Sequence, residues 1–128
     1  MIGASIYSLL DGHEPLTALV GSQIYPVQAP QGKKDPMVIY GISDQEGQHS
    51  KDRTSPEDWI TVDVLVYSKD YDNMHAIHKQ VRAALDGYSG TVASNDISQI
   101  SFMKYEDGWE EEREAFAGVA TYQVISTP

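Results

Sequence analysis

The stretch WITVDVLVYS at residues 59–68 decides the fold, together with the segment Asp70–Gly87 that follows it. Apolar and polar side chains alternate along residues 59–68, with Thr61 and Asp63 on the polar side. Such alternation is typical of a strand with one face against a core and the other toward solvent. The face predicted to be buried carries Ile60, Val62, Val64 and Val66.

The segment after this strand predicts a helix. Its large apolar residues recur at spacings of 3, 4 and 4, which places them on one side of a helix. Asp70 can cap the start of this helix, and Gly87 can provide a left-handed exit at its end. The predicted apolar stripe consists of Met74, Ile77, Val81 and Leu85.

Two short helices are predicted near the N-terminus. Ile2–Asp11 has apolar residues at helical spacing and is followed by Gly12, a plausible stop. A second helix is expected from Pro15, a residue suited to the first helical position, through Val20, with Gly21 as its C-terminal cap.

Two strands and a loop are predicted between these helices and residue 59. Ile24–Val27 is a short strand, and Pro26 favours an edge position because proline cannot donate to a ladder. Met37–Ser43 is rich in β-forming residues. The stretch Ser43–Pro56 is expected to be a long, solvated loop, because it holds no large apolar residue after Ser43.

The C-terminal third predicts a long hairpin. Ile97–Glu106 and Ala115–Ile125 are its two strands, joined by Asp107, Gly108, Trp109 and a Glu-rich stretch. The predicted order is α-α-β-β-β-α-β-β. Grouped strands favour an α+β fold with a mixed, mainly antiparallel sheet and helices packed on one face. Residues 1–128 are expected to form a single domain.

Composition excludes several classes of function. Nine Lys and Arg face nineteen Asp and Glu, for a net charge of −10, so DNA is expected to pass this protein without specific binding. The sequence has no cysteine, which removes disulfides, thiolate nucleophiles and thiolate zinc sites. The N-terminus lacks a secretory signal pattern and no apolar run is long enough for a membrane span, so we expect a soluble, intracellularly made protein without membrane contact.

Possible metal ligands lie on the long predicted helix. Asp72, His75 and His78 are three residues apart, a spacing that brings side chains onto neighbouring turns. His78 borders the apolar stripe while Asp72 falls nearly opposite Met74, so the arc is too wide for convergence and a polar helix flank is the favoured interpretation. No metal site and no cofactor are predicted.

The acidic run before residue 115 has two interpretations. Its carboxylates are suitable calcium ligands, but the ordered Asp and Gly spacing of a calcium loop is missing, so a charged hairpin tip is favoured. Exposed charge there would discourage uncontrolled strand pairing and could set partner choice. The run comprises Glu106, Asp107, Glu110, Glu111, Glu112 and Glu114.

The sequence carries no constellation that points to catalysis. Serines with His13 or His49 could suggest a hydrolase, yet no Gly-x-Ser-x-Gly turn occurs, and neither a P-loop nor a dinucleotide fingerprint is present. No catalytic residue is therefore predicted. Trp59 and Trp109 allow two interpretations, interface anchors or core packing, and the sequence does not separate them.

Several stretches, in order along nearly the whole chain, resemble the phage tail-completion, or tail-terminator, family. They include the helix end and the turn after it at residues 81–90. The stretches are IYSLL at 6–10, LTALVG at 16–21, IYP at 24–26, APQG at 29–32, PMVIY at 36–40, the strand at 60–67 and VRAALDGYSG at 81–90.

This resemblance implies a structural virion protein rather than an enzyme. Members form a ring, expected here to be a homo-hexamer, at the head-proximal end of the tail tube, where they end tube polymerisation and meet the head-tail connector or head-closure protein. The protein would then be assembled in the host cytoplasm and reside at the neck end of the virion tail. The residues we expect at oligomer or tube interfaces are Asp44, Gln45, Glu46, His49, Lys51, Arg53, Trp109, Glu110 and Glu111.

Three other functions stay open at the level of sequence. A head-closure or neck adaptor protein would share the size, acidity and assembly behaviour. A metal-dependent hydrolase would use His75, His78 and carboxylates. A host-encoded binding module with the same fold would be expected only if the gene had no tail and capsid genes beside it.

Overall fold

The computed structural model describes residues 1–48 and 57–127. The order of elements is α-α-β-β-β-α-β-β-β, which confirms the α+β class and adds one short strand, β4, that the sequence prediction lacked. With a single apolar residue, the three residues of β4 give no periodic signal. The elements are α1 (Ile2–Asp11), α2 (Glu14–Val20), β1 (Ile24–Pro26), β2 (Met37–Gln48), β3 (Glu57–Ser68), α3 (Tyr71–Leu85), β4 (Gly90–Val92), β5 (Asn95–Glu110) and β6 (Ala115–Thr127).

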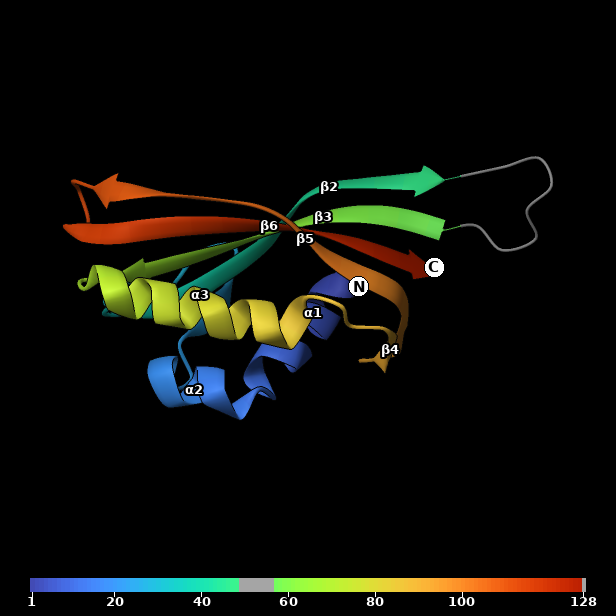
Figure 1. The fold of residues 1–128 in the computed structure, drawn as a ribbon, viewed down its shortest axis with the longest axis horizontal. Coiled ribbons are helices and arrows are strands. Elements are labelled where there is room, and N and C mark those ends of the chain that lie inside the picture. The colour runs from blue at the N-terminus through green and yellow to red at the C-terminus, as the bar shows by residue number, and fades with distance from the viewer. Residues whose placement is uncertain (49–56, 128) are drawn as a thin grey trace.

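The strands form one six-stranded sheet in the order β1-β2-β3-β6-β5-β4. Only β1 and β2 run parallel, and every other neighbouring pair is antiparallel. Within the described residues, all three helices lie on one side of this sheet, and none lies on the other side (Figure 1). The predicted mixed, mainly antiparallel sheet with helices on one face is therefore confirmed. No helix in the described ranges has the length and apolar character needed to cross a membrane.

The core lies between α3 and the two central strands, β3 and β6. The predicted stripe of α3 is fully buried, and the predicted inward face of β3 is buried with it. On β6 the same layer is completed by Ala120, Tyr122 and Val124. Burying an aliphatic side chain of this size contributes roughly 2 kcal/mol, so this double layer supplies much of the stability.

The ends of the helices follow the sequence signals closely. Gly12 and Gly21 end α1 and α2, and Gly87 follows α3 with a φ of 83°, in the left-handed region that favours glycine. Asp70 precedes α3 as predicted, but its side chain makes no capping hydrogen bond. Pro26 lies in β1, the strand at one edge of the sheet, as its missing N–H required.

The predicted loop at residues 43–56 is wrong in its first part. Residues 44–48 continue β2, with Gln45 opposite Ile60 and Glu46 opposite Trp59 in the register with β3. Because their side chains are polar, these residues show no alternation of apolar and polar positions that would predict a strand. Backbone pairing with β3 holds them in the extended conformation. The hairpin strand ending at Glu106 is likewise longer than predicted, since β5 continues to Glu110.

Two β-bulges in β5 bring its apolar residues to one face. The register with β6 shifts between Ile97 and Gln99 and again between Phe102 and Lys104. Phe102 therefore pairs with Tyr122 and Tyr105 with Ala120, so both aromatic rings face α3 although they are three residues apart. In a regular strand, residues three apart point to opposite faces, and the second bulge removes this alternation.

Replacing Gly118 by Ala should destabilise the fold. A Cβ at this position would lie 2.6 Å from the Tyr105 hydroxyl and 2.8 Å from His78 Nε2, so both rings must move. We expect the free energy of unfolding to fall by about 1–3 kcal/mol in urea titration followed by circular dichroism. Gly108→Ala is the matched control, because a Cβ there meets nothing within 4 Å. Equal stability of the two variants would contradict this packing.

Candidate functional site

The residues predicted at interfaces lie at opposite ends of the sheet. Asp44, Gln45 and Glu46 belong to the far end of β2, whereas Trp109 and Glu110 end β5 and Glu111 begins the turn before β6. Figure 1 shows the far end of β2 and the β5–β6 turn at opposite ends of the sheet. One chain therefore does not bring the two groups together. The remaining three predicted residues, His49, Lys51 and Arg53, lie outside the described residues.

Both tryptophans are exposed, so the core-packing interpretation is wrong. Trp59 is 40% exposed and lies on the sheet face that carries no helix, between Glu46 and Ile125 in the strand register. Trp109 is 50% exposed near the hairpin tip and packs edge-on against Phe116, with ring centroids 5.0 Å apart. Large exposed aromatic side chains are typical of residues that bury surface on association.

The turn between β5 and β6 is held tightly despite its charge. Lys69 Nζ donates to the backbone carbonyls of Arg113 and Glu114, at 3.0 and 2.9 Å. Arg113 Nε donates to Asp35 Oδ1 at 3.0 Å, and its guanidinium lies 4.2 Å from the centre of the Tyr67 ring. These contacts tie the turn to two other parts of the chain. Its acidic side chains are thus carried on a defined backbone.

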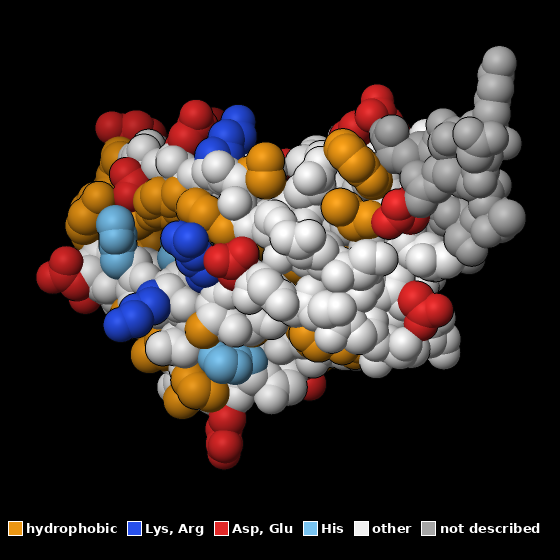
Figure 2. Space-filling view, turned by 45° about the vertical axis from the view of Figure 1, so that its right-hand side comes forward, with side chains coloured by type: hydrophobic (Ala, Val, Ile, Leu, Met, Phe, Trp, Pro, Cys, Tyr) orange, Lys and Arg blue, Asp and Glu red, His pale blue; other side chains and the backbone are white. Residues whose placement is uncertain are grey.

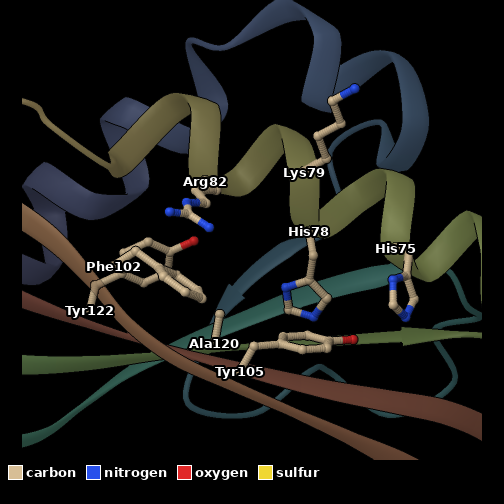
Figure 3. Close-up of a pocket in the computed structure, with 8 residues that line it drawn as sticks. All are labelled: His75, His78, Lys79, Arg82, Phe102, Tyr105, Ala120 and Tyr122. Atoms are coloured by element: carbon tan, nitrogen blue, oxygen red, sulfur yellow. The ribbon is translucent and has the colours of Figure 1, made fainter.

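A cavity of about 350 Å³ lies between α3 and the hairpin of β5 and β6. Figure 3 shows side chains of α3 pointing toward aromatic rings of the two strands. In the space-filling view, Lys and Arg, His and hydrophobic side chains gather in one area of this side of the molecule (Figure 2). The residues that line the cavity are His75, His78, Lys79, Arg82, Phe102, Tyr105, Ala120 and Tyr122.

His78 is the buried polar residue of this cavity. Burial lowers the pKa of its ring from 6.5 to about 4, although the nearby carbonyl of Gly118 opposes that effect. At neutral pH the ring is therefore uncharged. Its Nε2 lies 2.9 Å from the Gly118 carbonyl, so this nitrogen carries the proton and donates, and Nδ1 is left as an acceptor. Tyr105 packs edge-on against the ring at 4.8 Å between centroids.

Asp107 ties the hairpin to α3. Its Oδ2 accepts hydrogen bonds from the hydroxyls of Tyr71 and Tyr105, each at 3.0 Å, and from His75 Nε2 at 3.1 Å. Desolvation raises the pKa of this carboxyl, but the three donors outweigh it and the net pKa is lowered. Burial, with the Asp107 carboxylate as the second cause, raises the pKa of the Tyr105 hydroxyl. The predicted loop residue Asp107 is thus a structural clamp within β5.

The three possible metal ligands on α3 do not share a common partner. His78 donates to Gly118, His75 donates to Asp107, and Asp72 is exposed in the first turn of the helix. Within residues 1–48 and 57–127, no three His, Asp or Glu side chains are grouped so that they could hold a metal ion. This holds for the acidic hairpin turn as well as for α3.

Sequence reasoning missed most of the cavity. The sequence predicts a strand that contains Phe102 and Tyr105, but it does not predict that both side chains lie on the same face of the sheet. Strict alternation along a strand would put them on opposite faces. Their spacing of three, repeated in Ile97 and Ile100, was the available signal for bulges. Tyr122 gave no signal of its own, since its role depends on which α3 side chains lie opposite it.

One comparison with known proteins shows a family, and a second shows a similar fold. The family model described as tail completion protein gp17 matches residues 4–127. A chain from a structure titled "Virion of native gene transfer agent (GTA) particle" superposes with a TM-score of 0.73 at 16% sequence identity, covering 96% of this chain and 92% of that chain. No curated protein matches the sequence.

The buried, neutral His78 predicts a pH dependence of stability. The ring has a lower pKa in the folded state than in the unfolded chain, so its contribution is present above pH 6.5 and is lost as the pH falls toward about 4. The loss attributable to this residue is roughly 3 kcal/mol. Urea denaturation at pH values from 4.5 to 7 should show the free energy of unfolding rising with pH.

The variant His78→Gln should flatten this slope, because an amide can still donate to Gly118 without titrating. His75→Gln is the matched control, since His75 is an exposed histidine three residues away on the same helix. If His78→Gln keeps the wild-type slope between pH 4.5 and 6.5, the assignment of the slope to His78 is wrong.

Proposed function

Because this chain belongs to the tail completion protein gp17 family, and is therefore a structural protein of a phage tail, we propose that it forms a ring, a homo-hexamer, at the head-proximal end of the tail tube. There it ends tube polymerisation and presents the surface that meets the head-tail connector or head-closure protein. The observation that carries this proposal is the family match over residues 4–127. The ring would be assembled in the host cytoplasm and stay at the neck end of the tail.

The edges of the sheet support self-association. In the described part of the chain, β1 pairs with β2 only at Val38–Tyr40, and β4 pairs with β5 only at Asn95–Ile97. Among the described residues, the outer edge of β2 beyond Tyr40 and the outer edge of β5 beyond Phe102 therefore have no neighbouring strand. Open strand edges are natural contact surfaces between copies, and charged side chains along them limit which pairings form. Asp44 and Glu46 on β2 and Lys104 and Glu106 on β5 provide such charges.

The charge of the protein supports the passage of DNA through such a ring. A net charge of −10 gives no basis for phosphate contacts, which need clustered Lys and Arg. A ring of several copies multiplies this negative charge around its channel. DNA would then pass through during packaging or ejection without specific binding.

Light scattering coupled to size exclusion, on the protein alone and mixed with its tail-tube protein, tests the proposal. We expect a ring, or a monomer that becomes a ring on the tube. A protein that stays monomeric and does not bind the tail-tube protein would contradict the terminator function and favour a neck adaptor.

We expect Trp109→Ala to weaken assembly about tenfold or more, because an exposed aromatic near the hairpin tip would lose the surface it buries on association. Its free energy of unfolding should change little, since half of the side chain is exposed. Met103→Ala is the matched control, with a side chain that is 56% exposed on β5 but outside the predicted interface. Assembly measured by sedimentation at several concentrations separates the two. Equal assembly by both variants would remove Trp109 from the interface.

A further inference from the structure

The cavity between α3 and the β5–β6 hairpin contains two buried polar atoms without a partner. Within the described part of the chain, His78 Nδ1 and the Tyr122 hydroxyl make no hydrogen bond, and their side chains are 8% and 0% exposed. His78 Nδ1 is an acceptor, because the other ring nitrogen carries the proton. The Tyr122 hydroxyl can donate. Both atoms have almost no accessible surface, so this unused hydrogen-bonding capacity lies within the wall of the cavity and not at its mouth.

The rim of the same cavity is cationic. Lys79 and Arg82 follow His78 on α3, and Figure 3 shows both among the residues that line the cavity. Arg82 lies 4.0 Å from the centre of the Phe102 ring and 3.2 Å from Asp86, which fixes its position. Lys79 forms no ion pair with any described residue. Because Asp86 balances the charge of Arg82, Lys79 is the rim cation that has no ion pair within the described residues, and its charge favours an acidic partner.

The same chain carries a matching acidic segment. The turn at residues 110–114 contains Glu110, Glu111, Glu112 and Glu114, and the side chains of Glu111 and Glu112 are exposed. Lys69 and Arg113 hold its backbone in place, so the turn loses little conformational freedom when it docks. The exposed Trp109 beside it adds apolar surface that suits the aromatic wall of the cavity.

We propose that the acidic turn at residues 110–114 of one copy docks in the cavity between α3 and the β5–β6 hairpin of the next copy. Glutamate side chains of the turn meet Lys79 and Arg82, and Trp109 beside the turn packs against the aromatic wall that Phe102 and Tyr105 provide. Turn and cavity are different surfaces of the molecule, so the contact is head-to-tail, the type that closes into rings. This inference rests on the proposed function in that it requires copies of the chain to assemble.

Reciprocal charge reversal tests the contact. Lys79→Glu with Arg82→Glu, or Glu111→Lys with Glu112→Lys, should raise the concentration needed for assembly by about tenfold or more, because like charges would face each other. Combining all four substitutions should restore assembly toward the wild-type concentration. Asp11→Lys with Glu14→Lys is the matched control for the acidic pair, since both residues are exposed on the helical layer away from the turn. Light scattering at several concentrations, with the tail-tube protein present, provides the measurement.

The absence of cysteine allows a second, independent measurement. A chain carrying both Lys79→Cys and Glu111→Cys should form oxidised ladders up to the size of the ring, whereas Lys79→Cys with Asp11→Cys should not. Folding of each variant is checked by its urea unfolding transition.

The outcomes separate this contact from the proposed function. If the wild-type chain forms rings while both charge reversals assemble equally well and no ladder appears, the docking contact is wrong and the ring function stands. If the wild-type chain never assembles, with or without the tube protein, the proposed function fails and this contact fails with it.

Discussion

Most of the structure depends on the burial of one apolar helix face against two central strands. The stripe of α3 has no solvent exposure, and the inward residues of β3 and β6 fill the space beneath it. α1 and α2 pack beside α3 on the same side of the sheet, so they extend this layer instead of forming a second one. Within the described part of the chain, the opposite face of the sheet and the β5–β6 turn are therefore left for other contacts.

The same packing explains why the hairpin of β5 and β6 is rigid far from the core. His78 lies within the buried stripe of α3 and donates to Gly118 of β6, while His75 lies one turn earlier and donates to Asp107 of β5. The two histidines thus connect one helix to both strands of the hairpin. A close approach is needed for the first contact, and Gly118 allows it because a Cβ there would collide with the His78 ring. The polar side chains of His75 and His78 on α3 therefore fix the position of the hairpin that carries the acidic turn at residues 110–114.

The sequence predicted those elements whose periodicity is undisturbed. The strand at 59–68 and the stripe of α3 were predicted residue by residue, because alternation and helical spacing directly report one buried face. The sequence does not predict residues 44–48 and 107–110 as strands, since Trp109 is their single large apolar residue and backbone pairing with a neighbouring strand holds them extended. The cavity was missed because the bulge after Phe102 changes which residues share a face. Bulges depend on local backbone conformation that the hydrophobic pattern does not report.

The exposed acidic side chains and the firmly held backbone of the β5–β6 hairpin suit a protein that acts through contacts at its surface. Burial keeps the ring of His78 uncharged, and the Gly118 carbonyl determines that Nε2 carries the proton, so the cavity keeps an unpaired acceptor at neutral pH. Oδ2 of Asp107 accepts hydrogen bonds from three donors within the chain, whereas the side chains of Glu111 and Glu112, in the turn a few residues later, are exposed. One acidic group therefore stabilises the hairpin, and the others remain available to a partner. Because contacts within the chain fix the hairpin before any partner arrives, little conformational entropy is lost when a partner binds, and each contact in the proposed ring needs to supply less binding energy.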